Sequence, residues 1–208
     1  MYQYMQAGGV IMWVIAALSV AAFAVAAERL FFFRRSSTDP ERLEARFQEA
    51  MDRDDRGTLR SLLTESDSSL HRLFRVALLH WGIGREDMKL LIEQTIRSEI
   101  YRWEKHLAFL EVVGRIAPML GLLGTVLGMV DMFASLNTEG QITATAVTGG
   151  IWKALFTTVA GLFVAIPVVF VYCLLTSRID AQEECLNRGG DFLLRAHFAA
   201  PEKEGGRR

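Results

Sequence analysis

The sequence predicts an all-α membrane protein in which three transmembrane helices continue into long helices outside the bilayer. Three apolar stretches are each long enough to cross a membrane as a helix. The charged residues, 23% of a chain of 208, are kept out of these stretches. The net charge is −1, whereas a nucleic-acid-binding protein needs a basic patch. We therefore expect membrane lipids, and no nucleic acid, among the partners of this chain.

The three apolar stretches have different flanks. A helix needs about 20 apolar residues to cross the bilayer core. The first stretch covers residues 10–27, the second covers residues 116–130 and can be extended at both ends, and the third covers residues 154–175 without a charge. The alternative for the first stretch is a cleaved signal peptide. Basic residues precede the apolar part of a signal peptide, but none precedes residue 10, so we expect a retained span.

The distribution of lysine and arginine predicts the orientation. Residues 34–105 contain 14 of these basic side chains and six follow residue 176, whereas residues 1–9 and 136–150 contain none. Because basic residues mark the cytoplasmic side, we place the N-terminus in the periplasm and the C-terminus in the cytoplasm, across a bacterial inner membrane. The expected segments are a periplasmic N-terminus and first span (1–33), a cytoplasmic helical domain (34–110), the second span (111–136), a short periplasmic loop (137–150), the third span (151–176) and a cytoplasmic helix and tail (177–208).

Helical patterns continue outside the spans. Pro40 is typical of the first position of a helix. From Arg85 into the second span, apolar residues recur at spacings of three and four without Gly or Pro before Gly114, which predicts one helix of about 45 residues. Beyond the third span, apolar residues repeat every seven positions at Ile179, Leu186 and Leu193, although two glycines interrupt the repeat. We expect the third helix to continue there and the polar end, residues 201–208, to lie outside any fold.

Small residues form one face on each of the last two spans. Their spacings of three and four place them on the same side of a helix, and small faces allow helix backbones to approach closely in lipid. The residues are Pro118, Gly121, Gly124 and Gly128 in the second span and Ala154, Gly161 and Ala165 in the third. We therefore expect these faces to pack closely, and to leave space where several copies surround an axis.

Two threonines share these small faces. Thr125 and Thr158 lie at matching depths, about 13 and 10 Å below the outer ends of their spans, because the helices run antiparallel. A hydroxyl group can donate and accept a hydrogen bond at once, which suits a path for protons or a partly dehydrated cation. The alternative is that each threonine only bonds a carbonyl of its own helix in a packed bundle.

Titratable side chains are absent from the middle of all three spans. Proton carriers normally need such a group inside the membrane, so a carboxylate would have to come from another chain. Motifs of hydrolases and nucleotide-binding enzymes, such as H-E-x-x-H, G-x-S-x-G and the P-loop, are also absent. We expect no enzyme activity, no catalytic residues, no cofactor and no metal site.

Two motifs resemble the signatures of a known family. Residues 117–129 (APMLGLLGTVLGM) and 154–167 (ALFTTVAGLFVAIP) resemble those of the MotA/TolQ/ExbB proton channel family. Residues 7–9 and 28–30, around the first span, are similar to the short ExbB proteins of this family. The resemblance extends over nearly the whole chain and is weak only over residues 34–69.

This resemblance implies a homopentameric ring around a pore, which serves as the stator of an ion-driven motor. It implies a partner dimer of the ExbD/TolR type whose single spans enter the pore and supply a membrane aspartate, and work that passes on through a TonB-like protein. By position, Thr125 and Thr158 match the pore-lining threonines of the family, and we assign the adjacent Thr157 to the same path.

One position departs from the family pattern. Lys153 stands where a glutamate is common, and a lysine at the pore mouth would repel cations. Asp131 could compensate by pairing with it. A TolQ-type or gliding-type subunit of the same family and a non-conducting membrane scaffold therefore remain alternatives to an ExbB-like subunit, and the sequence leaves proton and sodium use open.

Overall fold

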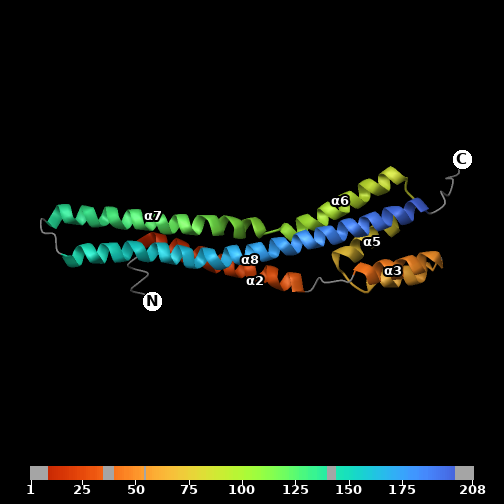
Figure 1. The fold of residues 1–208 in the computed structure, drawn as a ribbon, viewed down its shortest axis with the longest axis horizontal. Coiled ribbons are helices and arrows are strands. Elements are labelled where there is room, and N and C mark those ends of the chain that lie inside the picture. The colour runs from red at the N-terminus through yellow and green to blue at the C-terminus, as the bar shows by residue number, and fades with distance from the viewer. Residues whose placement is uncertain (1–8, 35–39, 54, 140–143, 200–208) are drawn as a thin grey trace. The chain divides into compact units, whose positions relative to one another are not determined.

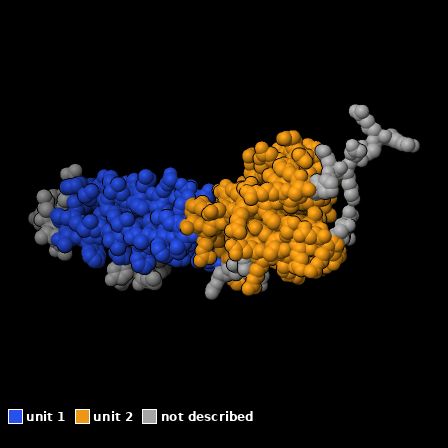
Figure 2. All heavy atoms as spheres, turned by 45° about the vertical axis from the view of Figure 1, so that its right-hand side comes forward, with its two compact units in different colours: residues 1–30, 106–175 blue, residues 31–105, 176–208 orange. Residues whose placement is uncertain are grey.

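The computed structural model describes residues 9–34, 40–53, 55–139 and 144–199 (Figure 1). The predicted polar end and part of the predicted periplasmic loop lie outside these residues. All elements in the described ranges are helices, namely α2 (Gly9–Arg34), α3 (Pro40–Asp52), α4 (Arg56–Thr64), α5 (Ser69–Leu79), α6 (Arg85–Glu104), α7 (Leu107–Glu139) and α8 (Ala144–Ala199). They form two compact units, the apolar unit of residues 1–30 and 106–175 and the polar unit of residues 31–105 and 176–208 (Figure 2).

Helices α2, α7 and α8 contain the three predicted spans. Their segments Gly9–Phe33, Leu107–Ala134 and Val147–Ala199 are long and apolar enough to cross a membrane. Helix α7 ends at Glu139 and α8 begins at Ala144. Both helices therefore include residues of the segment 137–150 that was predicted as a loop. Toward these ends the two helices contact each other, since a Cβ atom on Gly150 would lie 2.8 Å from the Met132 side chain.

The predicted helix of about 45 residues is wrong. It is interrupted between α6 and α7, where Lys105 has extended backbone and His106 has a φ of 70°. This left-handed conformation costs a non-glycine residue about 1 kcal/mol or more. Polar contacts accompany it: His106 Nδ1 lies 3.1 Å from Nη2 of the buried Arg29 and 3.6 Å from Oε2 of Glu28. No Gly or Pro marks the break, so local sequence signals could not reveal it.

The core of the polar unit combines the short helices with the last part of α8. Phe47 of α3 packs edge-on against Phe74 of α5, with ring centroids 5.0 Å apart, and Phe74 stacks on Phe192 of α8. The predicted spacing of seven residues between apolar positions of α8 is confirmed, because Ile179, Leu186 and Leu193 are all buried. Helix α3 also begins at Pro40 as predicted.

The two glycines inside this repeat do not interrupt α8. A Cβ atom on Gly189 would lie 2.6 Å from Leu70 Cδ1, and one on Gly190 would lie 2.9 Å from Ile92 Cγ2. The glycines therefore allow α5 and α6 to approach α8 more closely than any larger residue would permit. Their role is packing, and the interruption of the helical repeat that the sequence pattern indicated at these glycines is not present in α8.

A buried ion pair joins α5 to α6. Arg72 contacts both oxygens of Glu99, at 2.8 and 2.6 Å, and Trp103 donates a hydrogen bond to Ser69 beside the pair. Burial, the largest single effect, acts to raise the pKa of Glu99, but the hydrogen bonds from Arg72 and Ser69 and the charge of Arg72 together hold that pKa below its usual 4.5. This pair therefore fixes the two helices only while Glu99 is ionised.

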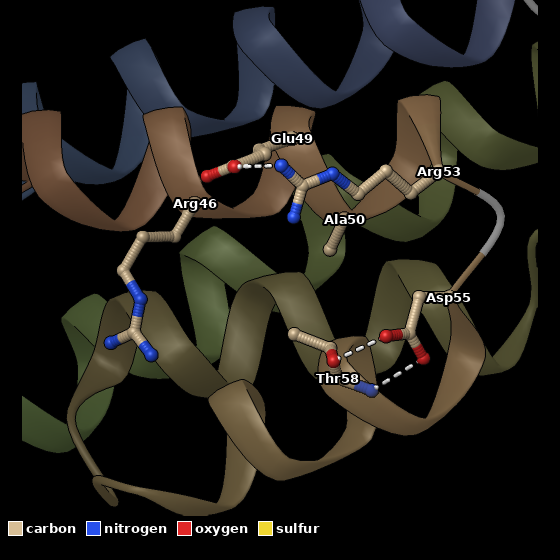
Figure 3. Close-up of a pocket in the computed structure, with 6 residues that line it drawn as sticks. All are labelled: Arg46, Glu49, Ala50, Arg53, Asp55 and Thr58. Carbon is tan, nitrogen blue, oxygen red and sulfur yellow. Dashed lines mark hydrogen bonds and ion pairs between the residues drawn. The ribbon is translucent and has the colours of Figure 1, made fainter.

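A shallow hollow of about 80 Å³ lies at the connection between α3 and α4 (Figure 3). Asp55 caps α4 by accepting hydrogen bonds from Thr58 and Gly57, and these bonds, that from the Thr58 hydroxyl first, lower the pKa of its carboxyl group. Arg53 pairs with Glu49 one turn earlier at 2.7 Å. Arg46, which also lines the hollow, pairs with Glu65 at 2.9 Å. Because its charged groups already have partners, we interpret this hollow as part of a surface turn.

We predict that Glu99→Gln destabilises the polar unit by roughly 3 kcal/mol, because it leaves the Arg72 charge with only the exposed carboxylate of Asp67 as a partner. The measurement is thermal unfolding of the purified protein across pH. A carboxyl group whose pKa is lowered in the folded state stabilises the fold at pH values above its usual pKa, which is 4.5 here. This contribution disappears as the pH falls through the lower pKa of the folded state.

The difference between wild type and Glu99→Gln should therefore shrink below about pH 4.5. The matched control is Glu49→Gln, which removes an exposed ion pair and should cost less than about 0.5 kcal/mol. Equal effects of the two substitutions would contradict the assignment of a stabilising role to the Arg72–Glu99 pair.

Candidate functional site

Helices α7 and α8 lie side by side (Figure 1), and their small faces pack directly against each other. A Cβ atom on Gly161 would lie 2.5 Å from the carbonyl oxygen of Ala117, and one on Gly121 would lie 2.9 Å from Thr158 Cα. A Cβ atom on Gly128 would lie 3.1 Å from that of Ala154. Backbone therefore meets backbone, which is the packing expected of small residues in a membrane.

Two further glycines extend this contact beyond the predicted set. A Cβ atom on Gly114 would meet Val169 at 2.6 Å, and Gly150 contacts Met132 at the other end. Sequence reasoning missed both. The sequence contains a signal that could have identified Gly114, because Gly114, Gly121 and Gly128 follow one another at intervals of seven residues along α7.

These contacts set the register of the two antiparallel helices. Gly128 lies opposite Ala154, Gly124 opposite Thr157, and Gly121 opposite Gly161. Seven residues along α7, from Gly128 to Gly121, are therefore matched by seven residues along α8, from Ala154 to Gly161. In this register Thr125 and Thr158 differ in depth by about one residue, or roughly 1.5 Å. This agrees with the matched depth that the sequence predicts for the two hydroxyl groups.

The three threonines use their hydroxyl groups differently. Thr158 donates across the helix pair to the Gly121 carbonyl oxygen at 3.1 Å. Thr125 donates to the Leu122 carbonyl of its own helix at 2.6 Å, so the alternative of a locally bonded threonine applies to it. Thr157 lies 2.7 Å from the Ala154 carbonyl of its own helix and 3.2 Å from that of Gly121.

Burial separates these residues further. Thr157 is only 2% exposed, while Thr125 and Thr158 are half-buried in the single chain. Of the predicted small face, Ala154 and Ala165 are buried, as are Gly121, Gly124 and Gly161, while Pro118 and Gly128 are half-buried. The structure thus brings the predicted small faces together and places Thr157 inside the contact between them.

The charged residues at the predicted pore mouth lie near one end of this contact. Asp131 of α7 is exposed and Lys153 of α8 is half-buried. Lys153 directly precedes Ala154, which contacts Gly128 one turn before Asp131. Within the described part of this single chain, no ion pair joins the two side chains.

The arrangement brings oxygen atoms together but lacks a proton-titrating group. Hydroxyl groups and a backbone carbonyl meet at Gly121, and α7 and α8 carry no Asp, Glu, His, Lys or Arg over residues 116–130 and 154–177. Among the described residues, no group of three His, Cys, Asp or Glu side chains could hold a metal ion. A proton path here would need a carboxylate from a second protein.

The sequence of this chain, including α7 and most of α8, is similar to proteins of one known family. The sequence profile of the MotA/TolQ/ExbB proton channel family matches residues 61–188. The chain is 31% identical to a biopolymer transport protein ExbB homolog of Methanothermobacter thermautotrophicus, over 84% of this chain and 62% of the relative. It is 30% identical to a biopolymer transport protein, ExbB-like 3, of Synechocystis, over 78% of this chain and 79% of the relative. It is also 29% identical to the Tol-Pal system protein TolQ of Pseudomonas aeruginosa, over 85% of this chain and 79% of the relative.

We predict that Gly161→Ala disrupts the packing of α7 on α8, because the added methyl group would overlap the backbone of Ala117, which cannot move aside as a side chain can. Overpacking of this kind typically costs about 1–3 kcal/mol. The measurement is the yield and thermal stability of the detergent-purified protein. Gly149→Ala is the matched control in the same helix, because its Cβ atom would meet nothing within 4 Å.

A compensating pair tests the same contact from the other direction. Gly128→Ala alone should destabilise the protein, and Ala154→Gly in the same chain should recover most of the loss, because it removes the methyl group that the new one meets. Stability of Gly161→Ala equal to that of Gly149→Ala, or no recovery in the double variant, would show that the helices pack differently.

Proposed function

Because the chain belongs to the MotA/TolQ/ExbB proton channel family, we propose that it is the ExbB-like, pore-forming stator subunit of a motor driven by ion flow across a bacterial inner membrane. The family consists of channel and motor proteins rather than enzymes. The observation that carries the proposal is the pair of threonines at one depth on closely packed small faces, without a carboxylate in residues 116–130 or 154–175, the middle of these two spans. Such a path conducts protons only when a partner supplies the titrating group.

The exposed surface of the spans supports assembly into a ring. Large apolar side chains remain exposed in the single chain, for example Met119 at 67% on α7 and Phe163 at 78% on α8. Lipid and neighbouring subunits together would cover these side chains. We propose a homopentamer, the number that the family implies, with an ExbD/TolR-like dimer in its pore.

The polar unit supports the proposed orientation. It carries the basic segment of residues 34–105 and the basic end of α8, which the positive-inside rule places in the cytoplasm. The short connection between α7 and α8, which lacks lysine and arginine, would then face the periplasm. The pore mouth formed near Asp131 and Lys153 would open on that side.

Two assignments compete within the family. Relatives named for biopolymer transport match this chain at 30–31% identity, and the TolQ protein of the Tol-Pal system matches it at 29%. We favour an ExbB-like role, with energy passed on through a TonB-like protein, because the stretches before and after the first span resemble short ExbB proteins. The TolQ-type role is the second candidate, supported by a match of comparable length.

We predict that Thr158→Val abolishes ion flux while the ring still assembles. Valine is close to threonine in shape but cannot donate a hydrogen bond to Gly121, so packing survives and the polar path is cut. Thr125→Val should be similar or milder, because its hydroxyl group bonds only its own helix.

The assay is proton influx into vesicles that contain the chain and an ExbD/TolR-like partner, with native mass spectrometry to verify a pentamer. Wild-type flux in both variants would identify the threonines as packing residues. A monomer or dimer in the mass spectrum would contradict the ring.

We also predict a charge relationship between Asp131 and Lys153 across the assembled ring. Asp131→Asn should lower ion influx roughly tenfold, because several uncompensated lysines would then surround the mouth. Lys153→Glu should be tolerated, and Asp131→Asn combined with Lys153→Gln should recover flux. Wild-type conduction by Asp131→Asn would contradict this relationship and indicate that Lys153 extends toward the lipid–water boundary, where a long side chain can place its charge in water.

A further inference from the structure

Two consecutive threonines on α8 occupy different environments, and the difference assigns them different roles. We propose that Thr157 is a positioning residue that holds Thr158 in place and lies outside the ion path. This inference rests on the proposed function, because it concerns which hydroxyl group serves the path. It also replaces the expectation that both residues line the pore.

Thr157 fills the recess that Gly124 leaves on α7. A Cβ atom on Gly124 would lie 2.7 Å from Thr157 Cβ and 3.1 Å from its methyl carbon, and would also overlap its hydroxyl oxygen. The Thr157 side chain is therefore enclosed by the opposite helix, consistent with its 2% exposure. A side chain enclosed in this way fixes the rotation of α8 about its own axis, because any turn would drive it into the α7 backbone.

The hydroxyl group of Thr157 is already bonded inside its own helix. It carries one proton, and the Ala154 carbonyl at 2.7 Å is a better placed acceptor than the Gly121 carbonyl at 3.2 Å. The Gly121 carbonyl is thereby left to accept from Thr158 at 3.1 Å. Thr158 is half-buried and so keeps one side open for an ion or a partner.

The two roles make opposite demands on the side chain at position 157. A positioning residue needs the branched shape that fills the recess, and its hydroxyl group is dispensable. An ion-path residue needs the hydroxyl group, and its methyl group is dispensable. Thr157→Val keeps the shape without the hydroxyl group, whereas Thr157→Ser keeps the hydroxyl group without the methyl group.

The test compares proton influx per assembled pentamer for Thr157→Val, Thr157→Ser, Thr157→Ala and Thr158→Val, each full chain expressed with its partner. We expect Thr157→Ala and Thr157→Ser to lose flux about fivefold, because α8 can rotate and misplace the Thr158 hydroxyl group. Thr157→Val should recover most of that loss, since it refills the recess. Normalising to the pentamer counted by native mass spectrometry separates this effect from poor assembly.

The rank order of the two conservative variants decides the outcome. Flux higher in Thr157→Val than in Thr157→Ser supports positioning, and flux equal or higher in Thr157→Ser overturns it. Thr158→Val separates this inference from the proposed function. If Thr158→Val conducts as wild type, the proposed path itself fails, whereas a non-conducting Thr158→Val with Thr157→Ser equal to or above Thr157→Val overturns only the positioning role.

Discussion

The close contact between α7 and α8 is the constraint on which the rest of the apolar unit depends. In lipid, apolar side chains gain little by leaving the solvent, so helices associate through tight packing and hydrogen bonds. Here the two backbones come closest at Gly121 and Gly161. They admit one register only, and that register brings Thr125 and Thr158 to one depth and places the Gly121 carbonyl within reach of a hydroxyl group.

Each of the two units is stabilised by a different kind of internal packing, although α8 takes part in both. The polar unit has a conventional core of large side chains, with Phe47, Phe74 and Phe192 in mutual contact and a buried ion pair at its side. The apolar unit has few large side chains inside and many outside, which is the inverse arrangement expected where lipid replaces water. Glycine serves both units in the same way, by letting a neighbouring helix approach, at Gly121 in one and Gly189 in the other.

Periodicity and length were sufficient to predict most of the fold from the sequence. The three spans, the start of α3 at Pro40 and the continuation of α8 through Leu186 all follow from apolar spacing and residue preference. The break at His106 could not be predicted, because its backbone conformation accompanies contacts with Glu28 and Arg29, which are far away in the sequence.

The candidate site was predictable in outline and not in detail. Spacing alone located the small faces and the depth of the threonines, because both follow from the geometry of a single helix. It could not distinguish Thr157 from Thr158, which are separated by about 100° around the helix. That choice depends on how α8 is rotated against α7, and the enclosure of Thr157 by Gly124 is a property of the pair of helices.

The continuity of α8 has a consequence for synthesis on the ribosome. All the other described helices precede it in the chain, yet it supplies Thr158 and Gly161 to one unit and Leu186 and Leu193 to the other. Neither unit can close before this last helix emerges, so the nascent chain must pass through a stage in which the glycine face of α7 and the core beside Phe74 are both uncovered. The third span emerges before the last part of α8, so the apolar unit can close first and the polar unit only afterwards. A chain truncated ahead of α8 would leave both units open to aggregation and proteolysis.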